Sequence, residues 1–303
     1  MVNRLLMAVP VLFGVATIAF ALMYLLPGDP ASAMLAKSGA SAEQIAELRE
    51  DMGLDLPFHV QYLRYLGNVL QGDLGRSIVS QEPVLNLLLS RLPTTLELVF
   101  AALIVAVPVG TLFGVVAAVR KDRWIDRALV AFSSIGVSVP AFWLGLMLIL
   151  VFSVYLGWLP AFGASGIAHL VLPAGVLAFN AIGTVMRTAR TSMLDVLRQD
   201  YIRTAWAKGL TKPAILYRHA LRNALVPVVT IIGLQFGWLV SGSFIVEAVF
   251  SRQGIGLLFI NSILERDFPV VQGAVLLAAV MYVVLNLVID LLYVIVDPRI
   301  RYD

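Results

Sequence analysis

Residues 128–186 read ALVAFSSIGVSVPAFWLGLMLILVFSVYLGWLPAFGASGIAHLVLPAGVLAFNAIGTVM and contain no formally charged side chain over 59 positions. As a single helix this stretch would be about 88 Å long at about 1.5 Å per residue, whereas the hydrocarbon core of a bilayer is about 30 Å thick. The stretch therefore predicts two membrane crossings. A cluster of glycine and proline residues between Gly157 and Gly166 marks the break between them.

Other long uncharged runs flank this one. Together with a composition that is 60% hydrophobic and only 14% charged, they exclude a free soluble protein, in which about a quarter of the residues carry a charge. We therefore predict an all-α membrane protein with six transmembrane helices. The helices are expected at roughly residues 5–26, 96–119, 130–156, 169–186, 225–246 and 270–295.

Lysine and arginine are distributed unequally between the connecting segments. One set of segments holds 15 of these residues in 55 positions: residues 1–4, 120–127, 187–222 and 297–303. The other set holds 7 in 100 positions: residues 27–93, 157–168 and 247–267. Because basic segments stay on the cytoplasmic side, both termini are predicted to be cytoplasmic.

Two polar insertions interrupt what is otherwise a single transmembrane domain over residues 1–303. The first, at 31–93, is predicted to be a small helical cap outside the cytoplasm. Ser41 and Gln44 form a capping box for a helix that ends near Gly53. A second short helix follows Pro57. Its apolar side is expected to carry Val60, Leu63, Leu66 and Leu70.

The second insertion, at 187–224, is predicted to be a cytoplasmic helix-turn-helix. Its first helix is expected at about 193–208, and Gly209 follows where a left-handed C-cap is needed. Thr211 is a plausible N-cap for the next helix, and Pro213 suits its first turn. A loop that only fixed topology would need none of these features, so the segment is predicted to dock on another protein.

Several segments resemble the permeases of ATP-binding-cassette (ABC) importers, and most closely the branch for dipeptides, oligopeptides, nickel and glutathione. Residues 200–210 (DYIRTAWAKGL) and 218–227 (RHALRNALVP) resemble the EAA loop of that family. Agreement extends along nearly the whole chain. The further matching segments are LPGDP at 26–30, GDLGRS at 72–77, RDFPVVQG at 266–273 and DPRIR at 297–301.

The resemblance implies that the cytoplasmic insertion is a coupling helix that sits in a groove of a separate ATPase subunit. Gly209 permits the turn, and Arg203 and Lys208 suit contacts with acidic or carbonyl groups. The residues assigned to this contact are Asp200, Tyr201, Arg203, Thr204, Ala205, Ala207, Lys208, Gly209 and Leu210. The chain departs from the general pattern at 203–205, where Arg-Thr-Ala replaces Glu-Ala-Ala, and at Gln253, where a proline is expected.

The sequence contains no Gly-x-x-x-x-Gly-Lys-Ser/Thr loop for binding a nucleotide phosphate. The chain is therefore expected to be a transport subunit and no enzyme, with no cofactor of its own and with ATP and Mg²⁺ bound by partner subunits. The expected partners are a second related permease, two ATPase subunits, an extracytoplasmic substrate-binding protein and membrane lipid, but no nucleic acid. Three scattered histidines and the absence of cysteine indicate no metal site. The expected location is the bacterial inner membrane.

Small and polar residues in the fifth predicted span are candidates for helix packing or for the pore: Gly233, Gln235, Gly237, Ser241 and Ser243. Gly110 and Gly114 form a similar small face in the second span. Glu97 and Asp290 lie inside or at the edge of spans, and a structural role is favoured for both. Pro108 and Pro140 are candidate kink positions.

The cargo remains open at this point between a di- or oligopeptide, glutathione and a nickel chelate. An ion-coupled secondary transporter is an alternative, although such carriers usually bury ionisable residues near the middle of the membrane. An intramembrane serine enzyme built on Ser138 is a further alternative. No histidine lies deep in a predicted span to act as its base.

Overall fold

The computed structural model describes residues 2–25, 31–32, 41–51 and 53–296. The predicted motif segments at 26–30 and 297–301 therefore lie outside the described residues, as does the side chain of Asp290. The chain divides into two compact units. Unit 1 comprises residues 1–93 and 253–284, and unit 2 comprises residues 94–252 and 285–303.

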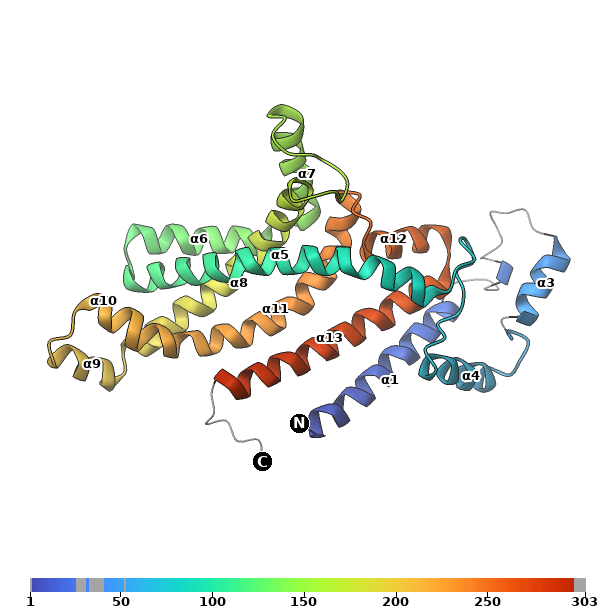
Figure 1. Ribbon diagram of the computed structural model, residues 1–303, viewed down its shortest axis with the longest axis horizontal. Helices are drawn as coiled ribbons and strands as arrows, with labels where there is room; N and C mark the ends of the chain where they lie inside the picture. Colours follow the sequence, from blue (N-terminus) through green and yellow to red (C-terminus); the bar gives the residue numbers. More distant parts are fainter. Residues whose placement is uncertain (1, 26–30, 33–40, 52, 297–303) are drawn as a thin grey trace. The chain divides into compact units, whose positions relative to one another are not determined.

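The regular structure of the described residues is helical (Figure 1). Two short π-helical segments, η1 and η2, interrupt the α-helices. The helices are α1 (Val2–Leu25), α3 (Ala42–Asp51), α4 (Phe58–Leu70), α5 (Val84–Val119), α6 (Trp124–Ser138), α7 (Ala141–Leu148), η1 (Ile149–Tyr155), α8 (Ala168–Leu197), α9 (Asp200–Ala207), α10 (Lys212–Ala214), η2 (Ile215–Ala220), α11 (Leu221–Val249), α12 (Ile255–Glu265) and α13 (Phe268–Val296).

Within the described residues, five helices are long and apolar enough to cross a membrane, and a bent pair brings the number to six if it forms one span. The six-helix prediction is confirmed at this level. The third predicted span, at 130–156, is not one straight helix. It consists of α6 and α7–η1, which meet at an angle of 103°.

Proline chemistry explains this bend. Pro140 has no amide hydrogen to donate to the preceding turn, and it disfavours the helical conformation of the residue before it. Val139 accordingly adopts an extended conformation, with φ −77° and ψ 124°, and ends α6. Pro140 then begins α7, which turns away from α6 (Figure 1).

Glycines set the close packing of α8 in unit 2. A Cβ atom added to Gly114 of α5 would lie 2.6 Å from the Cβ of Ala189 and 2.6 Å from the backbone oxygen of Met186. Gly183 of α8 lies equally close to α6, since its added Cβ would be 2.7 Å from the backbone oxygen of Ser133. The Ser133 hydroxyl also donates a hydrogen bond to the carbonyl of Gly183, at 3.2 Å. The small face predicted for α5 is therefore a packing face.

The insertion at 31–93 belongs to unit 1. The capping box at the start of α3 is confirmed, because the Ser41 amide donates to Gln44 Oε1 at 2.9 Å and the Gln44 amide donates to Ser41 Oγ at 3.3 Å. After α3, Gly53 adopts the left-handed conformation, with φ +65°. Asp267, just before α13, accepts hydrogen bonds from the hydroxyl of Ser77 and the amide of Ile78. Insertion and last helix are thus joined by polar contacts.

The apolar side predicted for α4 is wrong in part, because Leu63 is 64% exposed and Leu70 is 87% exposed. Aromatic side chains pack against α1 instead. Tyr62 and Tyr65 both contact the ring of Phe20, and the Tyr62 hydroxyl lies 2.6 Å from Thr17 Oγ1. Burial, and secondarily the neighbouring Tyr62, raises the pKa of Tyr65 to about 12. The tyrosines were missed because the aliphatic residues alone form a plausible helical stripe.

We predict that Gly114→Ala destabilises the protein by about 1–3 kcal/mol, because the added methyl group overpacks the contact with α8. The thermal unfolding of the purified protein in detergent measures this effect. Gly175→Ala, also in a membrane helix, is the matched control, since its Cβ meets no atom within 4 Å. Equal stability of the two variants would contradict the packing role of Gly114.

Candidate functional site

The cytoplasmic insertion forms an elbow that consists of α9, the turn at Gly209, α10 and η2, and we call residues 198–220 the elbow. The boundaries differ from the predicted helix at 193–208, because α8 continues without a break to Leu197. Gln199 is extended, with φ −70° and ψ 149°, and this conformation separates α8 from α9. Gly209 has φ +77°, which confirms the predicted left-handed turn.

After the turn, Thr211 is extended and precedes α10, but its side chain makes no capping hydrogen bond. Pro213 occupies the first turn, as predicted. The helix then continues through η2 into α11, so residues 212–249 form one candidate span of 38 residues. The elbow is therefore continuous with the membrane helix that follows it.

A buried apolar cluster attaches the elbow to the membrane helices of unit 2. Ile202 and Ile215, from the two arms of the elbow, are 1% and 0% exposed. They pack with Met193 of α8 and Ala118 of α5. We call this set the elbow core, and its buried members are Ala118, Met193, Ile202, Ala205, Ile215, Ala220 and Ala224. Because such a core is close-packed, the elbow cannot move far without moving α5 and α8.

The residues predicted to contact an ATPase fall into two groups. Ala205 is 7% exposed and belongs to the elbow core, so it packs inward in this chain. The other predicted residues are all exposed: Asp200, Tyr201, Arg203, Thr204, Ala207, Lys208, Gly209 and Leu210. Arg203 and Asp200 form an exposed ion pair at 3.3 Å, and the Tyr201 hydroxyl accepts a hydrogen bond from Asn223 at 2.8 Å.

The candidate pore residues of α11 do not share one surface. Gln235 is 5% exposed and Ser243 is fully buried, with its hydroxyl bonded to the carbonyl of Val240 at 2.8 Å. Gly233 is buried and Gly237 half-buried, whereas Ser241 is exposed. Burial of Gly233, Gln235 and Ser243 within unit 2 therefore favours the packing role predicted as one alternative for this set, and the role of Gly237 and Ser241 stays a prediction.

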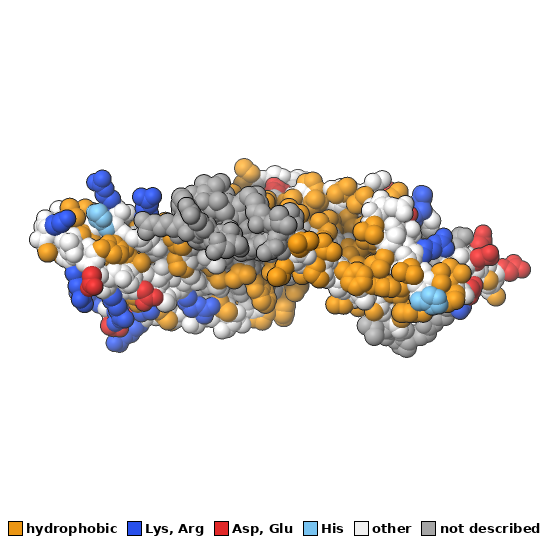
Figure 2. Space-filling model, turned by 90° about the horizontal axis from the view of Figure 1, so that it is seen from below, with side chains coloured by type: hydrophobic (Ala, Val, Ile, Leu, Met, Phe, Trp, Pro, Cys, Tyr) orange, Lys and Arg blue, Asp and Glu red, His pale blue; other side chains and the backbone are white. Residues whose placement is uncertain are grey.

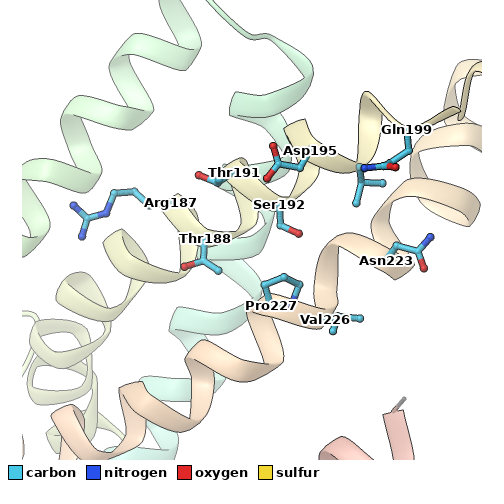
Figure 3. A pocket seen from close by; sticks show the side chains of 10 residues that line it. Arg187, Thr188, Thr191, Ser192, Asp195, Gln199, Asn223, Val226 and Pro227 are labelled. Carbon is cyan, nitrogen blue, oxygen red and sulfur yellow. The ribbon is translucent and has the colours of Figure 1, made fainter. Parts of the chain in front are cut away.

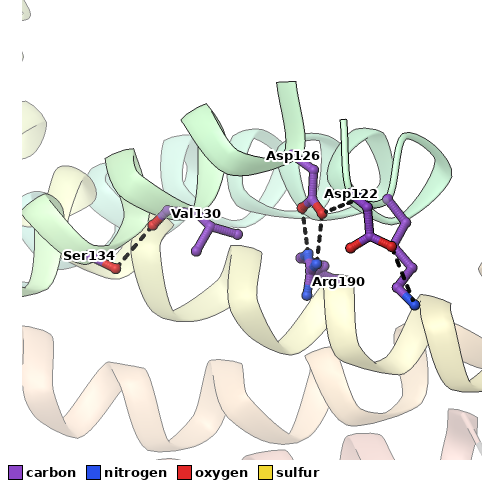
Figure 4. Close-up of polar contacts among 6 residues, drawn as sticks. Asp122, Asp126, Val130, Ser134 and Arg190 are labelled. Carbon is purple, nitrogen blue, oxygen red and sulfur yellow. Dashed lines mark hydrogen bonds and ion pairs between the residues drawn. The ribbon is translucent and has the colours of Figure 1, made fainter. Parts of the chain in front are cut away.

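An ion pair between α6 and α8 was not anticipated from the sequence. Asp126, only 3% exposed, accepts hydrogen bonds from Arg190 Nε at 2.7 Å and from Arg190 Nη2 at 2.8 Å (Figure 4). The amide of Asp122 donates a third, at 3.0 Å. A usable signal was present, since both residues lie within a few positions of the ends of the uncharged run at 128–186. Their partnership depends on how α6 packs on α8.

A second buried charge lies at the other end of α5 and α8. Arg252 is fully buried and donates to Glu97 Oε2 at 3.0 Å and to the carbonyl of His169 at 3.3 Å. Glu97 therefore has the structural role that was favoured for it.

In unit 1, the Gln253 amide oxygen accepts a hydrogen bond from Arg91 at 2.8 Å, so the residue that replaces the expected proline has a partner of its own.

An open pocket of about 770 Å³ lies between α8 and α11, next to the elbow (Figure 3). Thr188 and Ser192 point from α8 toward Pro227 of α11, and Arg187 extends to one side (Figure 3). Seven of the ten lining residues have polar or charged side chains: Arg187, Thr188, Thr191, Ser192, Asp195, Gln199 and Asn223. The other three are Val196, Val226 and Pro227. Among the described residues, no group of three or more His, Cys, Asp or Glu side chains is placed to hold a metal ion.

Comparison with known proteins identifies the family. Residues 110–302 match the family of binding-protein-dependent transport system inner membrane components, and residues 1–99 match the N-terminal region of such membrane components. The chain belongs to this family. It is a multi-pass permease subunit of an ABC importer, which removes the secondary transporter and the intramembrane enzyme as alternatives.

Full-length relatives agree with this assignment. The glutathione transport system permease protein GsiC of Salmonella paratyphi A is 46% identical over 300 residues, which cover 99% of this chain and 98% of the relative. A Brucella abortus (strain 2308) protein named as a peptide transport system permease is 43% identical over 309 residues, with the same coverage.

Solved structures support the fold. The inward-facing MetNI methionine ABC transporter matches 70% of this chain and 96% of its own chain, with a TM-score of 0.60 and 21% identity. An amino acid ABC transporter crystallised with histidines matches 69% of this chain and 93% of its own, with a TM-score of 0.53 and 20% identity.

We predict that Asp126→Asn destabilises unit 2 by about 1.5–3 kcal/mol, because a charge-assisted bidentate contact is lost and Arg190 remains largely buried. Thermal unfolding in detergent measures the change. A double-mutant cycle with Arg190→Gln tests the coupling, since the second substitution should cost much less once the first is present. Fully additive effects would contradict a direct pair.

Proposed function

We propose that this chain forms half of a membrane pore that imports di- or oligopeptides, with glutathione as the alternative cargo. The named relatives support these two cargoes rather than a nickel chelate. Both cargoes are small, polar and charged at neutral pH, so neither crosses a lipid bilayer unaided. Selectivity is expected to reside mainly in an extracytoplasmic binding protein that delivers the cargo.

The single observation that carries the mechanism is the attachment of the elbow. The outer surface of the elbow is exposed, whereas its inner surface packs against α5 and α8 through the elbow core. A partner that pushes on the outer surface would therefore displace the membrane helices as rigid bodies. The elbow is thus suited to convert closure of an ATPase pair into opening or closing of the pore.

ATP is proposed to be bound and hydrolysed, with Mg²⁺, by separate subunits, because the chain has no phosphate-binding loop of the Walker type. One chain supplies one elbow, and a pair of ATPase subunits presents two grooves. A second, related permease is therefore required to complete the assembly. The substrate-binding protein is expected on the opposite side of the membrane.

Charge supports the proposed orientation. Lysine and arginine side chains gather over the end of unit 2 that holds α9 and α10 (Figure 2). Arg203, Lys208 and Lys212 are all exposed there. By the positive-inside rule this end faces the cytoplasm, as do both termini, in the inner membrane.

The proposed function is tested by reconstituting the complete importer in proteoliposomes and measuring uptake of a labelled dipeptide and of labelled glutathione. Uptake should require ATP, the ATPase subunits and the binding protein. It should persist when the proton and sodium gradients are collapsed. Uptake of neither cargo, with a stimulated ATPase, would contradict the proposed substrate class.

We predict that Gly209→Val lowers ATP-driven uptake at least tenfold while the chain still inserts and assembles. Valine is strained by about 1–3 kcal/mol at a positive φ, although its Cβ would meet no neighbour within 4 Å. Gly209→Asn is the matched control, because asparagine tolerates the left-handed conformation. Uptake by the valine variant at the wild-type rate would exclude the turn from coupling.

We also predict that Arg203→Glu weakens co-purification of the ATPase subunits severalfold, because it reverses an exposed charge at the centre of the elbow surface. Arg123→Glu is the control, since this residue is exposed outside the elbow. Undiminished co-purification for Arg203→Glu, or an equal loss for the control, would count against a contact at Arg203.

A further inference from the structure

One face of α8 is polar over several turns. Asn180, Thr184, Arg187, Thr191 and Asp195 recur at spacings of three and four residues, which places them on one side of the helix. We call this side, together with Thr188 and Ser192 between its members, the α8 polar face. The opposite side is apolar and buried, and it carries Val185, Met186, Ala189 and Met193.

The contacts between α8 and α5 indicate how deep the α8 polar face lies in the membrane. Gly114 of α5 lies against Ala189, and Gly110 lies against Val185. Both glycines belong to the uncharged run at 98–119, and Gly114 precedes Arg120, the first charge after that run, by about 9 Å of helix. Residues 184–188 of α8 therefore lie at the depth of membrane-embedded residues of α5.

At the same depth, α5 and α8 present opposite chemistry. Leu112 is 59% exposed, as suits contact with lipid. Helical periodicity places it on the side of α5 opposite Gly110 and Gly114, which face α8. Arg187 is also exposed, and Thr184 and Thr188 are half-buried. A guanidinium group is costly to place in hydrocarbon, so intramembrane charges almost always face a water-filled cavity or the interior of a bundle.

The pocket gives this face a concave shape. Polar residues of α8 from Arg187 to Asp195 form part of its wall together with Val196 and, just after α8, Gln199, and Pro227 lines the facing side on α11. In the described part of the chain neither Arg187 nor Asp195 forms an ion pair with its side chain. Their charges thus remain available to a ligand.

We propose that the α8 polar face lines the aqueous, cytoplasmic half of the translocation path and that its two charges contact the two ends of a peptide. Arg187, one turn from the hydroxyl of Thr191, suits a terminal carboxylate, whereas the Thr188 hydroxyl already donates to the carbonyl of Thr184 at 3.1 Å. Asp195 suits the ammonium end. The two residues are about 12 Å apart along the helix, close to the length of an extended tripeptide. The peptide contact rests on the proposed function, whereas the aqueous path does not.

Single cysteines test the aqueous path, because the chain contains no cysteine of its own. Thr184→Cys and Thr188→Cys are compared with Leu112→Cys in the complete importer, in membrane vesicles with the ATPase side outward. A charged, membrane-impermeant methanethiosulfonate reagent should modify the two α8 positions at least tenfold faster than Leu112→Cys. Equal rates, or two unreactive α8 positions, would overturn the path.

Uptake tests the peptide contact. Arg187→Gln should lower tripeptide uptake about tenfold at normal expression and ATPase assembly, and Arg187→Lys should retain most of it. Arg127→Gln is the control, because Arg127 is exposed on α6 and lies outside the pocket. Unchanged uptake by Arg187→Gln would overturn the contact. If the wild-type importer transports neither peptide nor glutathione, the proposed function is wrong. The cysteine-labelling rates would still show whether the α8 polar face lines an aqueous path.

Discussion

The close approach of α8 to its neighbours is the constraint on which the rest of unit 2 depends. Glycines at 110, 114 and 183 remove the side chains that would hold α5 and α6 away from it. In a membrane, where helix association gains little from the hydrophobic effect, such backbone contact is a main source of association energy. The helix is thereby held from two sides, and a third side is left for polar residues.

Two further interactions extend this rigid assembly toward the elbow. The Asp126–Arg190 pair joins the start of α6 to α8 at the level of the Gly114 contact and about two turns from the Gly183 contact. The elbow core then joins Met193 to both arms of the elbow. The charged pair is directional and fixes register, whereas the apolar cluster supplies close packing. Through these contacts the elbow packs directly on the membrane helices that it is proposed to move.

The sequence was sufficient for features that depend on local chemistry. Uncharged runs located the spans because a charge in hydrocarbon is costly wherever it occurs. The capping box at Ser41 and the left-handed turn at Gly209 were also predictable, since both follow from backbone geometry within a few residues.

Features that depend on tertiary packing were not predictable. Ala205 looked like a docking residue, yet it faces inward because Ile202 and Ile215 need a partner surface on Met193. The polar residues of α11 looked like candidates for a pore lining, yet Gln235 and Ser243 lie inside the packed unit. Helical periodicity in a sequence predicts which residues lie on the same side of a helix. It does not predict which neighbouring helix covers that side.

Placing the polar face on α8 rather than α11 changes how coupling to transport is understood. The same helix carries Met193 in the elbow core on one side and Thr188 on the polar side. For a helix of about 45 Å, a rigid tilt of about 10° around its outer end moves the inner end by about 8 Å. That displacement exceeds the width of an extended peptide chain, for which neighbouring strands lie about 4.8 Å apart. One rigid helix can therefore both receive the push at the elbow and change the width of the path, without any hinge between the two.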